Sequence, residues 1–396
     1  MLRSLFIGLL SILSVLGAGC GRPADQVTTI KFWGFGNEGE MVRPLIAEFE
    51  RLNPTIKVEV QQIPWTAAHE KLLTAYAGES TPDVCQLGNT WIPEFTVLNA
   101  LEPLDTFVRS SATADRNDIF PGVLKTNVID SVLYGLPWYV DTRVVYYRKD
   151  ILKKAGYDEL PATWSEIAVA ADRIKEQAKK EGRTCYPLFL PTNEWVPIIA
   201  LGMQSGGNFL KNDHSRGNFS GPEFMKAAGL ITDFYAKEYS PSGMQLITNL
   251  YHAFSDGLIV MYITGPWNIG EFSRRIPAEQ QDQWMTAPLP SMDSLRPGTS
   301  LPLGTSLVMF RTSKHKEAAW KLIEYLTSVE RSIEFYRITG NLPPRQSAWK
   351  DTAFANNRYI GAFYRQLQRV DPLPPIPEWE QIVIRLQTYV EYMATG

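Results

Sequence analysis

Apolar and polar residues in the first hundred positions follow the spacing of strands and helices in turn. Residues 28–33, 56–60 and 83–87 are short apolar or alternating runs that predict β-strands. Between them, residues 41–52 and 66–77 carry apolar side chains at helical spacing. This β-α-β-α-β order predicts a mostly parallel sheet with helices on its faces.

The chain after residue 150 has a similar pattern, which predicts a second α/β unit. A long amphipathic helix is expected over 164–182, because Thr163 and Glu166 have the spacing of a capping box. The continuous apolar run 258–263 is typical of a central parallel strand. Residues 284–303 are rich in proline and are interpreted as an irregular second crossing between the units. Further strands are expected at 185–190 and 306–310, and further helices at 222–239, 314–327 and 378–394.

The stretch 135–149 lies between the two units. It holds two rings, an acid and a base between Trp138 and Arg143, and then enters a strand at 144–147. Pro137 favours an extended entry, because its ring restricts φ and its predecessor avoids helical angles. We interpret the stretch as a crossing that faces a cleft. An ordinary buried strand, with its tryptophan in a core, is the alternative.

The first twenty residues have the features of an export signal. Arg3 precedes a 12-residue apolar run, 5–16, which is too short to span a bilayer. Gly17-Ala18-Gly19-Cys20 follows and resembles the acylation site of bacterial lipoproteins. We therefore predict a signal peptide over 1–19, lipidation of Cys20 and a polar tether over 20–26. A cleaved signal without a lipid is the alternative.

Composition limits the class of protein. A length of 396 residues predicts two or three domains. The formal charge is only −3 and no long run has one sign, which argues against nucleic acid as a partner. Cys85 and Cys185 lie in apolar runs and are expected to be free thiols, although a disulfide between them stays open. The four histidines are scattered, so no metal or other cofactor is expected.

Polar residues stand beside rings or glycines where the predicted strands end. The carboxyl ends of parallel strands are where open α/β sheets bind ligands. A sugar ring has an apolar face that packs on an aromatic side chain, and hydroxyl groups that pair with amides and carboxylates. Trp138, Trp195 and Trp267, together with Asn37, Asn89 and Asp141, would suit a carbohydrate.

The chain resembles the extracellular solute-binding proteins of ABC transporters, in the sugar-binding branch similar to maltose-binding protein. The resemblance is carried by residues 81–91, 135–147, 254–272 and 314–327, in this order behind the lipoprotein signal. It implies the type II periplasmic-binding-protein fold, two α/β lobes with a ligand cleft between them. The lobes are expected at 27–139 plus 290–340 and at 140–289 plus 341–396.

The resemblance also implies function and partners. Such a protein captures a mono- or oligosaccharide, closes by hinge bending and delivers the sugar to a membrane permease. It is expected to be a monomer without enzymatic activity, held by its lipid in the periplasm or on the outer face of the cytoplasmic membrane. Glu38 replaces a lysine of maltose-binding proteins, which argues against maltose itself. The implied ligand-binding residues are Asn37, Glu38, Asn89, Thr90, Trp91, Trp138, Asp141, Trp195, Trp267, Asn268, Gly304, Thr305 and Arg345.

Two other functions stay open at this point. A glycoside hydrolase needs two carboxylates about 5–9.5 Å apart, and Glu38, Asp141 and Glu194 are available. A binding protein for a polyamine, a metal or a phosphorylated compound is the other. A polyamine site would need several acids, and a phosphate site would need basic groups or bare helix N-termini. We read Asp141 as a hydrogen-bond acceptor for sugar, residues 139–143 as the first hinge crossing, and Arg143 as the partner of an acid in that crossing.

Overall fold

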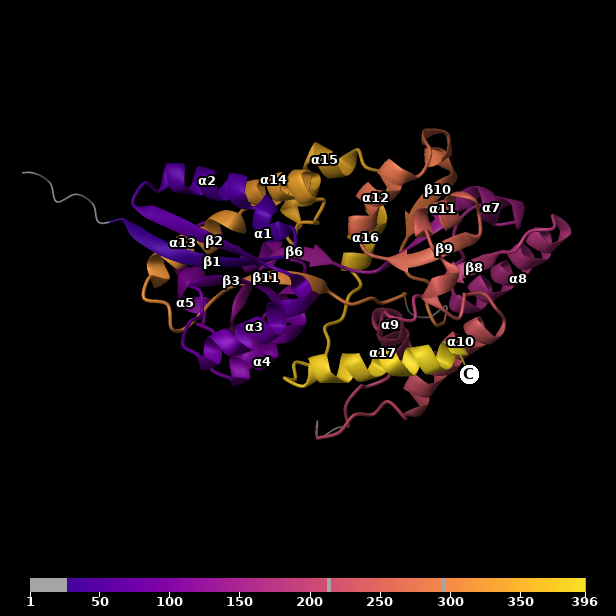
Figure 1. The fold of residues 1–396 in the computed structure, drawn as a ribbon, viewed down its shortest axis with the longest axis horizontal. Coiled ribbons are helices and arrows are strands. Elements are labelled where there is room, and N and C mark those ends of the chain that lie inside the picture. Colours follow the sequence, from indigo (N-terminus) through magenta and orange to yellow (C-terminus); the bar gives the residue numbers. More distant parts are fainter. Residues whose placement is uncertain (1–26, 212–214, 294–296, 396) are drawn as a thin grey trace, which may run out of the picture.

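Two α/β lobes lie side by side in the computed structural model, which describes residues 27–211, 215–293 and 297–395 (Figure 1). Each lobe is built on one sheet. The predicted two-lobe architecture is therefore confirmed. Cys20 and the signal lie outside the described residues. Within the described part, no helix is both long and apolar enough to cross a membrane.

The first lobe contains a five-stranded sheet in the order β2-β1-β3-β11-β6. Its first three strands are parallel, as predicted, but β11 runs antiparallel to both of its neighbours, so that the sheet is mixed. The strands are β1 (Thr28–Phe35), β2 (Ile56–Ile63), β3 (Val84–Gly88), β6 (Gly135–Asp141) and β11 (Leu303–Met309).

The second lobe contains a four-stranded sheet in the order β10-β7-β9-β8. All six residues of β9 (Ile259–Thr264) are buried between β7 (Val144–Arg148) and β8 (Tyr186–Phe189), as expected for a central strand. The expectation of a mostly parallel sheet is wrong for this lobe, because β7 runs antiparallel to both β9 and β10 and only β8 is parallel to β9. The interpretation of 284–303 as wholly irregular is wrong, because β10 (Trp284–Ala287) pairs with β7. The edge pairing gives this short segment backbone partners that no local pattern indicated.

Helices cover the sheets of both lobes (Figure 1). Those of the first lobe are α1 (Glu38–Met41), α2 (Arg43–Leu52), α3 (Trp65–Ala77), η1 (Asn89–Trp91), α4 (Ile92–Val97), α5 (Asp105–Ser110), η2 (Arg116–Asp118), α6 (Pro121–Lys125), α13 (Lys316–Leu326) and α14 (Val329–Thr339), with a small hairpin of β4 (Val128–Ile129) and β5 (Val132–Leu133). Those of the second lobe are α7 (Lys149–Lys154), α8 (Trp164–Lys180), α9 (Val196–Gln204), α10 (Pro222–Ala236), η3 (Met244–Leu246), α11 (Leu250–Ser255), α12 (Trp267–Arg275) and η4 (Ala278–Gln283). The last segments are η5 (Ser347–Lys350), α15 (Thr352–Ala355), α16 (Gly361–Leu367) and α17 (Trp379–Thr395).

The capping box of α8 is confirmed. The Thr163 hydroxyl accepts a bond from the Glu166 amide at 3.2 Å, and the Glu166 carboxylate accepts one from the Thr163 amide at 3.0 Å. Two amides at the helix start, which have no partner inside the helix, are satisfied in this way. The local sequence was sufficient to predict this cap, because Thr163 and Glu166 are only three residues apart.

The chain crosses between the lobes three times. The first crossing is residues 142–143, between β6 and β7, and the second leads from β10 to β11. The third lies between α15 and α16. α15 packs on η5, which itself packs on α14 of the first lobe, whereas α16 packs on β10 of the second lobe. There Tyr359 stacks on the buried Trp284 with 3.7 Å between ring centroids. α17 then runs along the second lobe and touches η1 of the first lobe at its start (Figure 1).

Candidate functional site

A cavity of about 300 Å³ opens between the lobes beside the first crossing. Two tryptophans in its wall are unusually exposed for large aromatic side chains, Trp65 at 38% and Trp267 at 43%. Trp65 begins α3 in the first lobe and Trp267 begins α12 in the second. Both lobes therefore supply an accessible ring. The full lining is Glu38, Trp65, Tyr139, Val140, Asp141, Pro266, Trp267, Gly304, Thr305 and Asn341.

The backbone before Trp267 is shaped to admit its ring. A Cβ atom on Gly265 would lie 1.9 Å from the indole, so only glycine allows this ring position. On one face, the Arg143 guanidinium carbon lies 4.7 Å from the ring centroid. A guanidinium over a tryptophan ring is attracted by the electron-rich face. The ring is therefore held by a cation on one face while part of its surface remains open.

Arg143 is also paired with two carboxylates. Its Nη1 donates to Oδ1 and Oδ2 of Asp141 at 2.8 and 2.7 Å, and its Nε lies 3.7 Å from a Glu194 carboxylate oxygen. Burial raises the pKa of both carboxyls above their ordinary values, and the positive charge of Arg143 partly offsets this. For Glu194 the negative charge of Asp141 adds to the rise in pKa. The expected pairing of Arg143 with an acid is confirmed.

Hydrogen-bonding groups of the first lobe complete the cavity. The Asn341 side-chain amide donates to Glu38 at 3.1 Å, and no cation lies within 4 Å of Glu38 among the described residues. The Tyr139 hydroxyl accepts a bond from Gln86 Nε2 at 3.2 Å, and burial raises its pKa well above the ordinary value. The buried Thr305 hydroxyl has no protein partner in the described part of the chain. The wall thus offers both acceptors and donors to a ligand.

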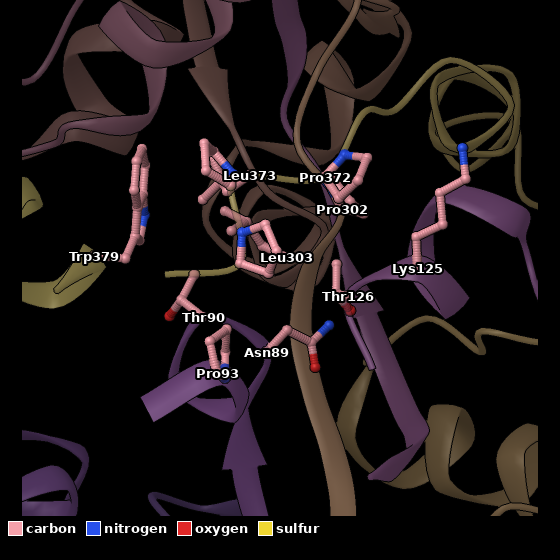
Figure 2. A pocket seen from close by; sticks show the side chains of 12 residues that line it. Asn89, Thr90, Pro93, Lys125, Thr126, Pro302, Leu303, Pro372, Leu373 and Trp379 are labelled. Carbon is pink, nitrogen blue, oxygen red and sulfur yellow. The ribbon is translucent and has the colours of Figure 1, made fainter. Parts of the chain in front are cut away.

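A second, smaller pocket of about 100 Å³ lies between the lobes (Figure 2). Trp379 stands on one side of it and Lys125 on the other, with Asn89 and Thr90 between them (Figure 2). Asn89 Oδ1 accepts a bond from Ser306 at 2.8 Å, whereas its buried Nδ2 has no partner in the described structure. The remaining lining residues are Pro93, Thr126, Pro302, Leu303, Pro372, Leu373, Pro374 and Pro375.

The structure brings most of the predicted site residues to the region between the lobes. Five of them line the larger cavity, namely Glu38, Asp141, Trp267, Gly304 and Thr305. Two line the smaller pocket, Asn89 and Thr90. The Trp91 ring lies 5.8 Å from that of Trp65. Its Nε1 donates to Glu380 of α17 at 3.1 Å, a bond between the lobes.

Three other predicted residues lie outside the walls of both pockets. Trp195 precedes α9 and packs edge-on against Trp379. Asn37 is exposed at the start of α1. Asn268 is buried, and its side chain bonds Thr264 and Tyr251. A role in ligand binding stays a prediction for these residues.

Two predicted residues belong to the protein interior. The expectation that Trp138 borders the cleft is wrong, because its side chain is fully buried and stacks on Phe335 at 4.4 Å. The core alternative is the correct one, since strand alternation turns this ring to the face covered by α14. Arg345 is 3% exposed and donates to the carbonyls of Thr327 and Thr113. It anchors the turn after α14, and the prediction that it faces the cleft is also wrong.

Five residues in the wall of the larger cavity were not predicted as ligand-binding residues: Trp65, Tyr139, Val140, Pro266 and Asn341. Trp65 follows the carboxyl end of β2, and that position is the sequence signal that points to it. Tyr139 lies in the predicted crossing, between the expected ligand-binding residues Trp138 and Asp141. Asn341 follows Gly340, which ends α14 with φ 79°, and no local signal separates it from an ordinary turn residue. Its position in the cavity depends on where α14 packs.

Comparison with known proteins gives consistent results. The family described as bacterial extracellular solute-binding protein matches residues 36–331. The structure of the sugar-binding protein MalE from Xanthomonas citri superposes with a TM-score of 0.88 at 44% identity, covering 93% of this chain and 92% of that one. A solute-binding protein of an ABC transporter from Thermotoga lettingae, bound to α-D-tagatose, superposes with a TM-score of 0.76 at 28% identity, covering 93% and 95%. The diacetylchitobiose-binding protein DasA of Streptomyces coelicolor is 25% identical over 370 residues, or 92% of this chain and 84% of that protein.

Trp138→Ala tests the assignment of this residue to the core. Removing a fully buried, stacked tryptophan is expected to lower the free energy of unfolding by about 3–5 kcal/mol, because a large cavity remains. Urea denaturation followed by circular dichroism measures this loss. Trp267→Ala, at an exposed ring, is the matched comparison and should cost less than about 1 kcal/mol. A small loss for Trp138→Ala would contradict the core assignment.

Glu194→Gln tests the cost of the buried carboxylate. The raised pKa of Glu194 means that the folded chain binds more protons than the unfolded one between their two pKa values, so wild-type stability falls as pH rises through that window. The variant is expected to melt at a higher temperature than wild type at pH 7, and the gap should narrow near pH 4. Glu176→Gln, at an exposed ion pair, is the control. A lower melting temperature of Glu194→Gln at pH 7 would contradict this expectation.

Proposed function

The chain belongs to the bacterial extracellular solute-binding proteins, and we propose that it captures a sugar without negative charge between its lobes and delivers it to the permease of an ABC transporter. The observation that carries the proposal is the pair of exposed tryptophans, Trp65 and Trp267, in the wall of one cavity that also contains carboxylates and a free hydroxyl. Stacking on rings and bonding to acceptors and donors are the two needs of a sugar.

Delivery requires that the sugar favours one arrangement of the lobes. Trp65 and Glu38 belong to the first lobe and Trp267 to the second, so a bound sugar gains all of these contacts only when the lobes are close. A ligand shifts an equilibrium by its difference in affinity for the two states. We propose that rotation about the three crossings opens and closes the cavity, and that the permease receives the closed form.

We further propose that the protein is exported as a monomer and held at the membrane through Cys20. The sequence ahead of residue 27 supports export and anchoring, since the apolar run and small residues before the cysteine have the order of a lipoprotein signal. Two acyl chains would give a stable anchor, whereas one chain binds only marginally. The lobes would then remain free to meet the permease at the membrane surface.

Hydrolysis and polyamine binding fit the cavity less well. Both oxygens of the Asp141 carboxylate accept hydrogen bonds from Arg143, so this carboxylate is engaged by the protein and is poorly placed to attack a sugar. A polyamine would need several free acids, and Glu38 alone lacks a cationic partner among the described lining residues. Among the described residues, no group of three or more His, Cys, Asp and Glu could hold a metal ion. We therefore propose binding without catalysis.

A thermal-shift screen tests the proposed function. Maltose, N,N′-diacetylchitobiose, galacto-oligosaccharides, arabino-oligosaccharides and tagatose form the panel, with spermidine as the cationic comparison. A sugar present at 100 times its Kd should stabilise the fold by about 2.7 kcal/mol and raise Tm. Trp267→Ala should lower the affinity for that sugar at least about tenfold, or about 1.4 kcal/mol. Tyr392→Ala, which removes an exposed ring on α17, should leave it unchanged. A rise in Tm with spermidine alone would exclude the sugar proposal.

Charge selectivity provides a separate test. A sugar carboxylate close to Glu38 would meet an uncompensated negative charge, at a cost on the order of a few kcal/mol. A glucuronate-containing disaccharide is therefore expected to bind at least about tenfold more weakly than its neutral counterpart in calorimetry. Glu38→Gln should reduce this difference. Equal affinities for the two sugars in wild type would contradict the role of Glu38.

A further inference from the structure

Arg143 occupies a special place in the first crossing. It is 7% exposed and does not belong to the wall of the sugar cavity. Its backbone amide donates to Ser300 Oγ of the second crossing at 3.2 Å, and its side chain bonds Asp141 twice. Both bonds come from one nitrogen, Nη1, while the Nε edge of the guanidinium faces Glu194, so the Asp141 carboxylate is held at one corner of the charged group. Arg143, on the side of Asp141 away from the cavity, thus fixes the orientation in which the Asp141 carboxylate lines the cavity.

The same guanidinium reaches two elements of the second lobe. Glu194, between β8 and α9, contributes a second carboxylate 3.7 Å away, and Trp267, at the start of α12, lays its ring over the guanidinium. Three elements that are far apart in the sequence therefore meet on one cation. Removing that cation would leave two partly buried carboxylates facing each other and a ring without its support.

From this geometry we infer that Arg143 is a positioning residue for sugar binding, which holds the Asp141 carboxylate and the Trp267 ring in their binding orientations without touching the sugar. The inference rests on the proposed function of the cavity. Lysine is an incomplete replacement, because an ammonium group keeps the charge but has no planar face to stack on the Trp267 ring. A neutral side chain supplies neither the charge nor the stacking face.

Arg148 provides a matched control on the next strand. It is equally buried, pairs with both oxygens of Asp150 and donates to the carbonyls of Phe254 and Ser255. It does not line the cavity. Arg148→Met therefore removes a buried, carboxylate-paired arginine from the same lobe without removing support from Trp267, which separates general destabilisation from loss of positioning.

Calorimetry on the purified full-length protein measures the effect. The probe is the sugar of the panel above with the largest rise in Tm. Arg143→Met is expected to weaken binding of this sugar at least about thirtyfold, and Arg143→Lys about fivefold. Arg148→Met should change the affinity less than about twofold, at a temperature where all variants are folded. In a double-mutant cycle, introducing Arg143→Met into the Trp267→Ala variant should weaken sugar binding by less than about a further threefold. Full multiplication of the two losses would mean that Arg143 acts independently of the ring, and would overturn the inference.

A spectroscopic readout needs no sugar. The protein is labelled with 5-fluorotryptophan, and the ¹⁹F resonance of Trp267 among the 11 tryptophans is assigned by its disappearance in Trp267→Phe. Arg143→Lys, the milder variant, should shift or broaden this resonance in the unliganded protein, while Arg148→Met leaves it in place. An unchanged resonance in both Arg143 variants would overturn the inference. If no panel sugar binds wild type, the proposed function fails, and this experiment still decides whether Arg143 positions the ring.

Discussion

The pairing of β6 with β11 is the constraint on which the rest of the structure depends. These two strands end the first sheet side by side and lead into the first crossing and out of the second, so their register sets the position of one lobe against the other. The close approach requires Gly304, which has φ 120° and whose Cβ would lie 2.4 Å from the Tyr139 carbonyl oxygen. The register shifts between Thr305 and Ser306, where the strand forms part of the cavity wall.

The cavity draws its chemistry from the ends of strands in both sheets. Asp141 ends β6, Trp65 follows β2 and Trp267 follows β9. Rigid strands hold the positions at which these side chains leave the backbone, and short turns with Gly36 or Gly265 give the rings room beside them. A site divided in this way between two lobes can bind its ligand and report the binding as a change in lobe arrangement.

Stability and binding compete for the same residue types in this chain. Trp138 and Trp267 are both tryptophans near the first crossing or a strand end, yet one is wholly buried on Phe335 and the other is 43% exposed over Arg143. Arg143 and Arg148 are both buried and both paired with an acid two residues away in the chain. One lies behind the cavity and the other donates to the last two carbonyls of α11, so residue type alone does not separate the roles.

Much of the architecture was determined by the sequence itself. Some features depend only on neighbours a few residues apart: the alternating and helical runs, the capping box at Thr163, and the acid and base at Asp141 and Arg143. These local features predicted the α/β units, the crossing and the pairing of Arg143. Only the tertiary structure decided that Trp138 and Arg345 turn inward, that β10 joins a sheet edge and that Asn341 enters the cavity. Those outcomes depend on which distant segment packs against each residue, such as α14 on β6, and a local pattern carries no information about that partner.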